Sequence, residues 1–227
     1  MRIHRHVHNY KIFMYIVIIV IVCNMLDAIL YINLEHRTDR RDHVLKEIRK
    51  ICKDDAKIHR IDAIRDAIGI RGCGLSHIKS LKYILEHPEW KHCLVLEDDF
   101  TFQSDDEADI RGKLDMFFND FKEFDVCVMS HNLLKSVDTH NDLIKKVIYS
   151  QTASSYILNT QFVPTLLHNF EESSNDMRLR GKRHTNCVDI HWSVLQPVSR
   201  WFAFDPRLGH QYDSYSDIEN RFMSYNV

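Results

Sequence analysis

The sequence predicts an α/β fold in which a mostly parallel central sheet is flanked by helices. After Asp27, apolar runs of strand length alternate with segments whose apolar residues recur at helical spacing, which is the pattern of strand–helix–strand units. The apolar run 93–96 also ends abruptly in three consecutive acids, at the kind of strand end where open α/β sheets bind ligands. A chain of 227 residues is long enough for one domain with a full core.

The expected elements follow one another along the chain. Strands are expected over residues 28–34, 58–61, 93–96 and 125–129, and a hairpin or two neighbouring strands over 146–150 and 154–159. Helices are expected over residues 40–52, 75–85, 160–170 and 188–195, and another begins near residues 104–107. The polar, basic segment 171–185 is expected to be a mobile loop.

Composition limits the classes of protein to which the chain can belong. The hydrophobic content of 44% and the charged content of 27% are those of an ordinary globular protein. A formal net charge of −2 gives no sign of a general nucleic-acid binder. The six cysteines form no CxxC pair, which argues against a zinc ribbon.

Residues 1–27 form a hydrophobic leader ahead of a domain expected over residues 28–227. The apolar run 12–23 is shorter than the roughly twenty residues of a membrane helix and resembles a signal-peptide core behind basic residues. Three alternatives remain open: an uncleaved anchor or signal, a cleaved signal, or an unused extension before a start at Met25. An anchor over residues 12–26 would make the protein membrane-associated, as a type II protein of the endoplasmic reticulum or Golgi. An unused leader would leave it cytoplasmic.

The acids Glu97, Asp98 and Asp99 are the strongest candidate site. Adjacent carboxylates repel one another unless a cation or hydrogen-bond donors lie beside them. Hard carboxylate oxygens suit Mg²⁺ or Mn²⁺, which commonly bridge a protein to phosphates. The alternative is a solvated loop that caps the next helix.

Three further segments carry polar chemistry. Asn33 ends the first strand, and the arginine-rich turn and helix start over residues 34–41 can hold the phosphates or ribose of a nucleotide. In segment 72–77, two glycines allow close approach of the backbone to a ligand where a helix begins, although a tight turn with a capping serine is the alternative. The last segment comprises Asp189 and residues 206–218.

In this order and spacing, the four segments resemble glycosyltransferase family 25, which includes bacterial lipooligosaccharide galactosyltransferases and animal procollagen galactosyltransferases. The resemblance covers nearly everything from Ala28 to Ile218. It implies a GT-A-like fold, a UDP-sugar donor (UDP-galactose or UDP-glucose) and transfer with inversion. The acids stand in place of the DxD motif, which holds Mn²⁺ against the donor pyrophosphate. The acceptor would be a hydroxyl on a glycan or on a collagen-like protein.

The resemblance also implies roles for individual residues. Metal ligands are expected at Asp99 first, at Asp98 second, and at the C-terminal His210. Asp189 is the expected general base, because it begins a late helix on the acceptor side, and His191 is the alternative. The nucleotide-sugar is expected to be bound by Asn33, Arg37, Gly72, Ser76, His77, Glu97, Tyr156 and Gln211.

Two other functions compete with this reading. A Mg²⁺-dependent phosphoryl transferase could use the same acids, but it needs a nucleophilic aspartate or a second acidic strand end that the sequence does not place. A catalytically inactive relative could keep the fold as a binding or chaperone module, and the retained acids argue against that alternative.

Overall fold

The computed structural model describes residues 25–181, 183–217 and 221–224. The expected leader lies outside these residues, apart from Met25 to Asp27, and so does nearly all of its apolar run. Within the described part, no helix combines the length and the apolar character needed to cross a membrane.

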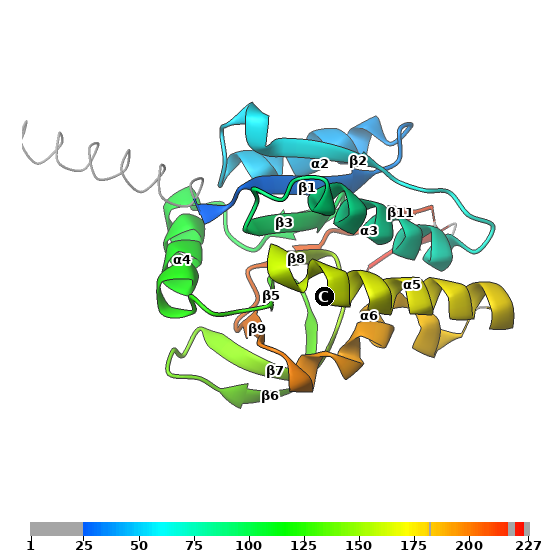
Figure 1. The fold of residues 1–227 in the computed structure, drawn as a ribbon. Coiled ribbons are helices and arrows are strands. Elements are labelled where there is room, and N and C mark those ends of the chain that lie inside the picture. The colour runs from blue at the N-terminus through cyan, green and yellow to red at the C-terminus, as the bar shows by residue number, and fades with distance from the viewer. Residues whose placement is uncertain (1–24, 182, 218–220, 225–227) are drawn as a thin grey trace, which may run out of the picture.

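A central sheet runs through the molecule (Figure 1). In the described residues it has eight strands in the order β2-β1-β3-β8-β5-β9-β7-β6. The strands are β1 (Ala28–Asn33), β2 (Ile58–Asp62), β3 (His92–Glu97), β5 (Val126–Val128), β6 (Asn132–Asp138), β7 (Ile144–Gln151), β8 (Ser155–Asn159) and β9 (Trp201–Phe204). Most strands point one way, whereas β8 and β7 run antiparallel to their neighbours. The predicted mostly parallel sheet is therefore confirmed, with two reversed strands inserted.

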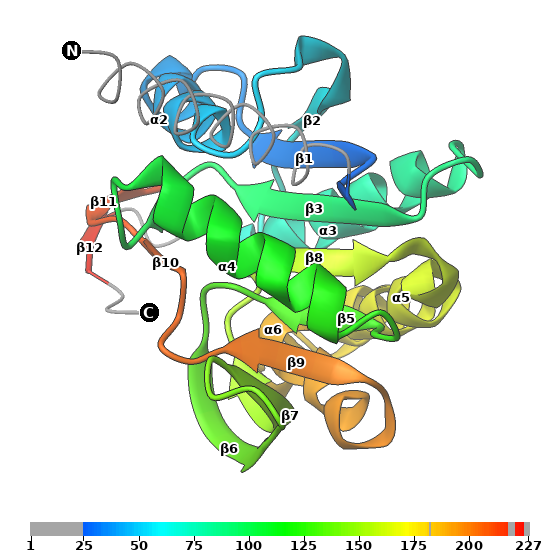
Figure 2. The ribbon, with the colours of Figure 1, turned by 90° about the vertical axis from the view of Figure 1, so that its left-hand side faces the viewer.

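Helices cover both faces of the sheet (Figure 2). Helices α2 (Thr38–Arg49) and α4 (Glu107–Asp120) pack on one face. Helices α3 (Gly69–Leu85), α5 (Val163–Arg180) and α6 (Val188–His191) pack on the other. Short 3₁₀ turns complete the chain: η1 (Asp55–Lys57), η2 (Thr160–Phe162), η3 (His184–Asn186), η4 (Trp192–Val194) and η5 (Gln196–Val198).

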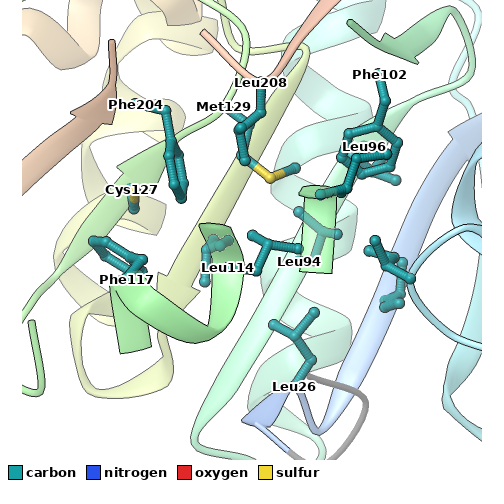
Figure 3. Close-up of a cluster of buried hydrophobic side chains, with 14 of the residues drawn as sticks. Leu26, Leu94, Leu96, Phe102, Leu114, Phe117, Cys127, Met129, Phe204 and Leu208 are labelled. Carbon is teal, nitrogen blue, oxygen red and sulfur yellow. The ribbon is translucent and has the colours of Figure 1, made fainter. Parts of the chain in front are cut away.

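Two hydrophobic clusters hold the layers together, because successive side chains of a strand point to opposite faces. Ile29 and Tyr31 of β1 enter the cluster under α2 and α4, whereas Ala28 and Leu30 enter the cluster under α3 and α5. Figure 3 shows the first cluster, where Phe117 of α4 lies over the sheet. Both clusters consist almost entirely of buried side chains, which are the main source of the fold's stability.

Two short antiparallel pairs lie beside the central sheet. Strand β4 (Phe100–Phe102) pairs with β10 (Gly209–Gln211), and β11 (Ser214–Ser216) pairs with β12 (Arg221–Met223). The first pair brings the C-terminal segment next to the residues that follow β3. Two strands that are more than a hundred positions apart in the sequence therefore pair beside the three acids.

Two sequence predictions about helices are wrong. Helix α3 begins at Gly69 rather than at Leu75, so segment 72–77 lies within a helix and is not a ligand-binding turn. Helix α5 continues to Arg180, through most of the segment expected to be a mobile loop. Its small polar side chains suit a buried helix face: Ser173 is fully buried and donates a hydrogen bond of 2.7 Å to the backbone oxygen of Asn186.

The glycines of α3 serve packing. An added Cβ at Gly72 would lie 2.6 Å from the backbone oxygen of Ile64, and one at Gly74 would lie 2.9 Å from a methyl group of Val188. The absent side chains let the helix lie close to the chain that follows β2 and to α6. Gly112 of α4, in contrast, has no atom within 4 Å of an added Cβ.

This difference predicts opposite effects of the same substitution. We expect Gly72→Ala to lower the free energy of unfolding by about 1–3 kcal/mol, since a backbone atom must move to admit the methyl group. We expect the matched Gly112→Ala to raise it by about 0.5–1 kcal/mol, because alanine is the better helix former in an open position. Urea unfolding of both variants measures the difference, and a stabilising effect at both positions would contradict the packing role of Gly72.

Candidate active site

A cleft of about 360 Å³ lies at the carboxyl ends of β1, β2 and β3. The floor comes from the acids at the end of β3, and Arg40 of α2 and Cys73 of α3 contribute the walls. Gln211 and Asp217 reach it from the C-terminal segment. Parallel strands end together at this edge, which is where open α/β sheets bind their ligands.

Asp98 and Asp99 are buried and held by polar partners from three elements. Asn33 at the end of β1 donates a hydrogen bond of 2.7 Å from Nδ2 to Oδ2 of Asp98. Nη1 of Arg40 lies 2.9 Å from Oδ1 of Asp98 and 3.2 Å from Oδ2 of Asp99. Nε2 of Gln211 lies 3.3 Å from Oδ1 of Asp99. The two carboxylates thus share one guanidinium group.

Glu97 points in another direction, toward α3. Its Oε1 lies 3.3 Å from Sγ of Cys73 and 3.2 Å from Nε2 of His77. Its Oε2 accepts a hydrogen bond of 3.2 Å from Gln211. Nδ1 of His77 lies 3.1 Å from the hydroxyl of Tyr156, which is buried on β8. A polar network therefore extends from the cleft into the core.

Burial and like charge control the ionisation of these acids. Burial and the charge of Glu97 raise the pKa of Asp99 to about 7, although Arg40 opposes them. Burial also raises the pKa of Asp98 against the effect of Arg40. Burial acts upward on the pKa of Glu97 as well, but the hydrogen bond and charge of His77 outweigh it and lower that pKa. The site is short of positive charge and favours a cation.

The donor set at Asp98 and Asp99 fits a hard divalent cation. Its oxygens are those of two neighbouring carboxylates, and the pair is bonded to Arg40 and Gln211. Mg²⁺ and Mn²⁺ prefer such oxygens. A bound cation would offset the negative charge of Glu97, which contributes to the raised pKa of Asp99.

Arg37 and Arg40 contact different partners. Arg37 pairs with Asp39 on its own helix and with Asp217, whose Oδ2 lies 2.6 Å from Nη1. Arg40 contacts the acids, and its Nη2 donates to the backbone oxygen of Tyr215 at 3.2 Å. Both arginines belong to the arginine-rich segment 34–41, in which the family resemblance singles out Arg37. The rotation of α2 about its axis decides which arginine faces the cleft.

Several residues expected to bind nucleotide lie behind the cleft or at its wall. Gly72 packs against the backbone of residues 64–66, and His77 and Tyr156 are fully buried. Ser76 lines the cleft, while its Oγ accepts a hydrogen bond of 2.8 Å from the backbone N–H of Ile64. These residues support the wall of the cleft through α3.

The two candidate bases lie on α6. Asp189 is the second residue of this helix and does not cap it, because Cys187 holds the N-cap position. Burial first, and the charge of Glu97 second, raise the pKa of Asp189. The backbone of Thr152, a non-glycine residue with a φ of 80°, acts to lower the pKa of this carboxylate. His191 is half-buried two residues further along.

His210 does not lie beside Asp99. Side chains alternate along β10, and Gln211 is the residue that contacts Glu97 and Asp99. Nδ1 of His210 is buried without a hydrogen-bond partner among the described residues, and burial and the charge of Arg207 lower the pKa of this imidazole. Gln211, and not His210, is therefore the residue of β10 that contacts the acids, and the metal-ligand role of His210 stays a prediction.

Comparison with known proteins tests the fold. No model of a protein family matches the sequence, and no curated protein matches it. The structure is similar to that of a glycosyltransferase involved in the glycosylation of the major capsid of PBCV-1, with a TM-score of 0.52 and 10% identity, covering 85% of this chain and 95% of that one.

Two further structures have lower TM-scores. UDP-glucose pyrophosphorylase complexed with UDP-glucose reaches 0.49 at 11% identity, covering 78% of this chain and 72% of that one. The glycosyltransferase GlyE of Streptococcus pneumoniae TIGR4 reaches 0.47 at 9% identity, covering 83% and 55%. The first structure, whose TM-score is 0.52, shows that the chain has a GT-A-like fold.

Proposed function

We propose that the protein is a metal-dependent, inverting glycosyltransferase that moves a hexose from a UDP-sugar to a hydroxyl of a glycan or a collagen-like protein. The observation that carries the proposal is the pair Asp98–Asp99, buried at the carboxyl edge of the sheet and open to a cleft. Galactose or glucose is the proposed sugar, in keeping with the resemblance to glycosyltransferase family 25.

The residues of the cleft suit a nucleoside diphosphate. Asp98 and Asp99 would hold Mn²⁺ or Mg²⁺, which neutralises the charge that develops on a diphosphate leaving group. Arg40 adds a guanidinium beside them, and Asn33 and Gln211 orient the carboxylates by hydrogen bonds. These residues fix the charges in advance, which is how a site stabilises a leaving group without reorganising during the reaction.

Asp189 is the proposed general base, and its Oδ would take the proton of the acceptor hydroxyl. Burial and the charge of Glu97 raise the pKa of this carboxylate, which makes it a better proton acceptor at neutral pH. His191 on the same helix is the alternative base.

Ligand-dependent thermal stability tests the proposal. We expect UDP-galactose or UDP-glucose to raise the melting temperature in the presence of Mn²⁺, because a ligand at about 100 times its Kd adds about 2.7 kcal/mol to the free energy of unfolding. Neither Mn²⁺ nor the nucleotide sugar alone should match the shift. Differential scanning fluorimetry with each sugar nucleotide, with and without Mn²⁺, makes the measurement.

The matched control is GDP-mannose, and the second readout is UDP release with glycan and collagen-like acceptors. A shift with no release would favour a binding module. A metal-dependent release of phosphate instead of UDP would favour a phosphoryl transferase. Absence of any nucleotide-dependent shift would contradict the proposed donor.

A further inference from the structure

Cys73, His77 and Glu97 place a thiol, an imidazole and a carboxylate together behind the acidic pair. Cys73 and His77 are four residues apart on α3, so their side chains lie on the same helix face. Glu97 faces them from the end of β3. One ligand atom from each of the three residues lies within 4.8 Å of the other two.

The spacing of these atoms resembles that of a metal cage. Tetrahedral zinc sites place their ligands about 2.0–2.3 Å from the ion, which separates neighbouring ligand atoms by about 3.3–3.8 Å. Sγ of Cys73 and Nε2 of His77 lie 3.3 Å and 3.2 Å from Oε1 of Glu97. The distances from Glu97 to Cys73 and to His77 therefore suit a zinc site. The remaining distance, between Sγ of Cys73 and Nε2 of His77, is within 4.8 Å, and a small movement of the Cys73 side chain would shorten it.

The second ring nitrogen of His77 supplies independent support. Nδ1 lies 3.1 Å from the buried hydroxyl of Tyr156. Histidines that bind metals usually engage their other nitrogen in a hydrogen bond, which fixes the tautomer and the ring orientation. A hydrogen bond donated by Nδ1 to Tyr156 leaves the lone pair of Nε2 directed toward Glu97 and Cys73.

The local charge also favours a cation. The carboxylates of Glu97, Asp99 and Asp189 are all close enough to Cys73 to act on its thiol electrostatically. Ion pairs of the acid cluster in the described residues are those of Arg40 with Asp98 and Asp99 and of His77 with Glu97. When His77 is neutral, as a metal ligand must be, none of these ion pairs supplies positive charge on the Cys73 side of the cluster.

We propose that Cys73, His77 and Glu97 bind a zinc-type divalent cation. Thiolate and imidazole ligands select Zn²⁺ over Mg²⁺ or Mn²⁺, which prefer sets of oxygens alone. Sulfur, Nε2 and Oε1 each donate an electron pair, and the thiol proton of Cys73 passes to solvent. Because Cys73 and Glu97 line the cleft, the fourth position faces it. The ion would fix α3 to the end of β3 and is separate from the cation proposed at Asp98 and Asp99.

Titration of the metal-free, full-length protein with Co²⁺ tests this site. Co²⁺ is a spectroscopic substitute for Zn²⁺, and a cysteine ligand produces an intense thiolate-to-cobalt charge-transfer band in the near ultraviolet. We expect one equivalent of Co²⁺ to produce the band and Zn²⁺ to displace it. Cys73→Ser should abolish the band. His77→Gln should weaken Co²⁺ binding by at least about tenfold, because loss of a residue that only supports a metal ligand already costs about that much affinity.

Matched variants separate this site from other thiols and from the proposed donor site. Cys187→Ser removes the other half-buried thiol of the described residues and should keep the band, and so should Cys23→Ser. Asp98→Asn should keep the band while losing Mn²⁺-dependent UDP release. If Asp98→Asn loses UDP release but keeps the thiolate-to-cobalt band, the zinc-type site is supported independently of the donor site.

Two outcomes would overturn the proposal: a folded wild type without a thiolate band, or a band that survives Cys73→Ser. The three side chains would then form only a hydrogen-bonded network. Circular dichroism checks the fold of each variant. Glu97→Gln provides a second measurement should Cys73→Ser fail to fold, because it retains the thiolate band and should weaken Co²⁺ binding.

Discussion

Asp99→Asn is expected to reduce Mn²⁺-dependent release of UDP from the donor by about 100- to 1000-fold. A cation at this position contributes several kcal/mol to stabilisation of the transition state, and about 1.4 kcal/mol corresponds to a factor of ten in rate. Asparagine keeps an oxygen that can accept the hydrogen bond of Gln211 but removes the charge that would hold the metal. The ratio kcat/KM for UDP release in the presence of Mn²⁺ is the measurement.

The same variant should remain folded, and its stability should depend less on pH. The pKa of Asp99 in the folded protein is about 7, well above its ordinary value of 3.8. A carboxyl group whose pKa is raised by folding stabilises the protein when protonated, and this contribution is lost as the pH rises from about 4 to about 7. Asparagine cannot ionise, so the variant should not lose this part of its stability as the pH rises. Urea unfolding at pH 5 and pH 8 tests the expectation.

Asp42→Asn is the matched control, because Asp42 is an exposed carboxylate on α2. It should leave both activity and pH dependence unchanged. Full activity in Asp99→Asn would exclude this carboxylate from metal binding. Equal loss in the control would trace the effect to general charge and not to the site.

Arg40→Met is expected to lower the free energy of unfolding by about 3–5 kcal/mol at pH 8, the usual result when one partner of a buried ion pair is removed. The guanidinium group is the shared partner of Asp98 and Asp99, and Nη2 also contacts Ser214 at 2.5 Å. Methionine retains much of the apolar length of the side chain, so the loss reports mainly on charge and hydrogen bonds. Urea unfolding measures it.

The penalty should shrink at pH 5. Asp98 and Asp99 both have raised pKa values in the presence of Arg40, with burial as the main cause. Without the guanidinium, these pKa values rise further, since Arg40 acts to lower them. Asp99, whose pKa is already about 7, is then protonated at pH 5, and less buried charge is left unpaired than at pH 8. The difference between wild type and variant therefore widens as the pH rises.

Arg49→Met is the matched control on the same helix. Arg49 pairs with Asp55 at the surface, where the side chain of Asp55 is 83% exposed. Exposed ion pairs contribute about 0–1 kcal/mol, so the control should change stability little at either pH. A similarly small effect of Arg40→Met at pH 8 would show that the arginine does not balance the acids.

Burial on both faces explains which elements could be predicted. The strands β1, β3 and β8 are continuous apolar runs because helices cover both sides of the sheet there. Strand β6 was missed because it is an edge strand with mostly exposed residues, and β4 and β10 were missed because they have three residues each. Their pairing depends on distant partners and leaves no local period.

Helix ends were harder to predict for a related reason. The glycines at 72 and 74 suggested a turn, yet they lie inside α3, where neighbouring segments approach the helix too closely for a side chain. The polar, basic character of residues 171–185 suggested a loop, yet most of the segment belongs to α5, and Ser173 there makes a buried contact with Asn186. In both cases, tertiary packing outweighed local propensity.

The alternation of strands and helices from β1 to β3, and the presence of acids at the carboxyl end of β3, follow from the sequence itself. Periodicity and apolar runs are local properties, and chain direction fixes which strand end the acids occupy. The choice of Arg40 over Arg37 and of Gln211 over His210 required the folded structure. These choices depend on the rotation of α2 and on the register of β10 against β4. Contacts between residues more than fifty positions apart are set by such side-chain directions, which no local pattern contains.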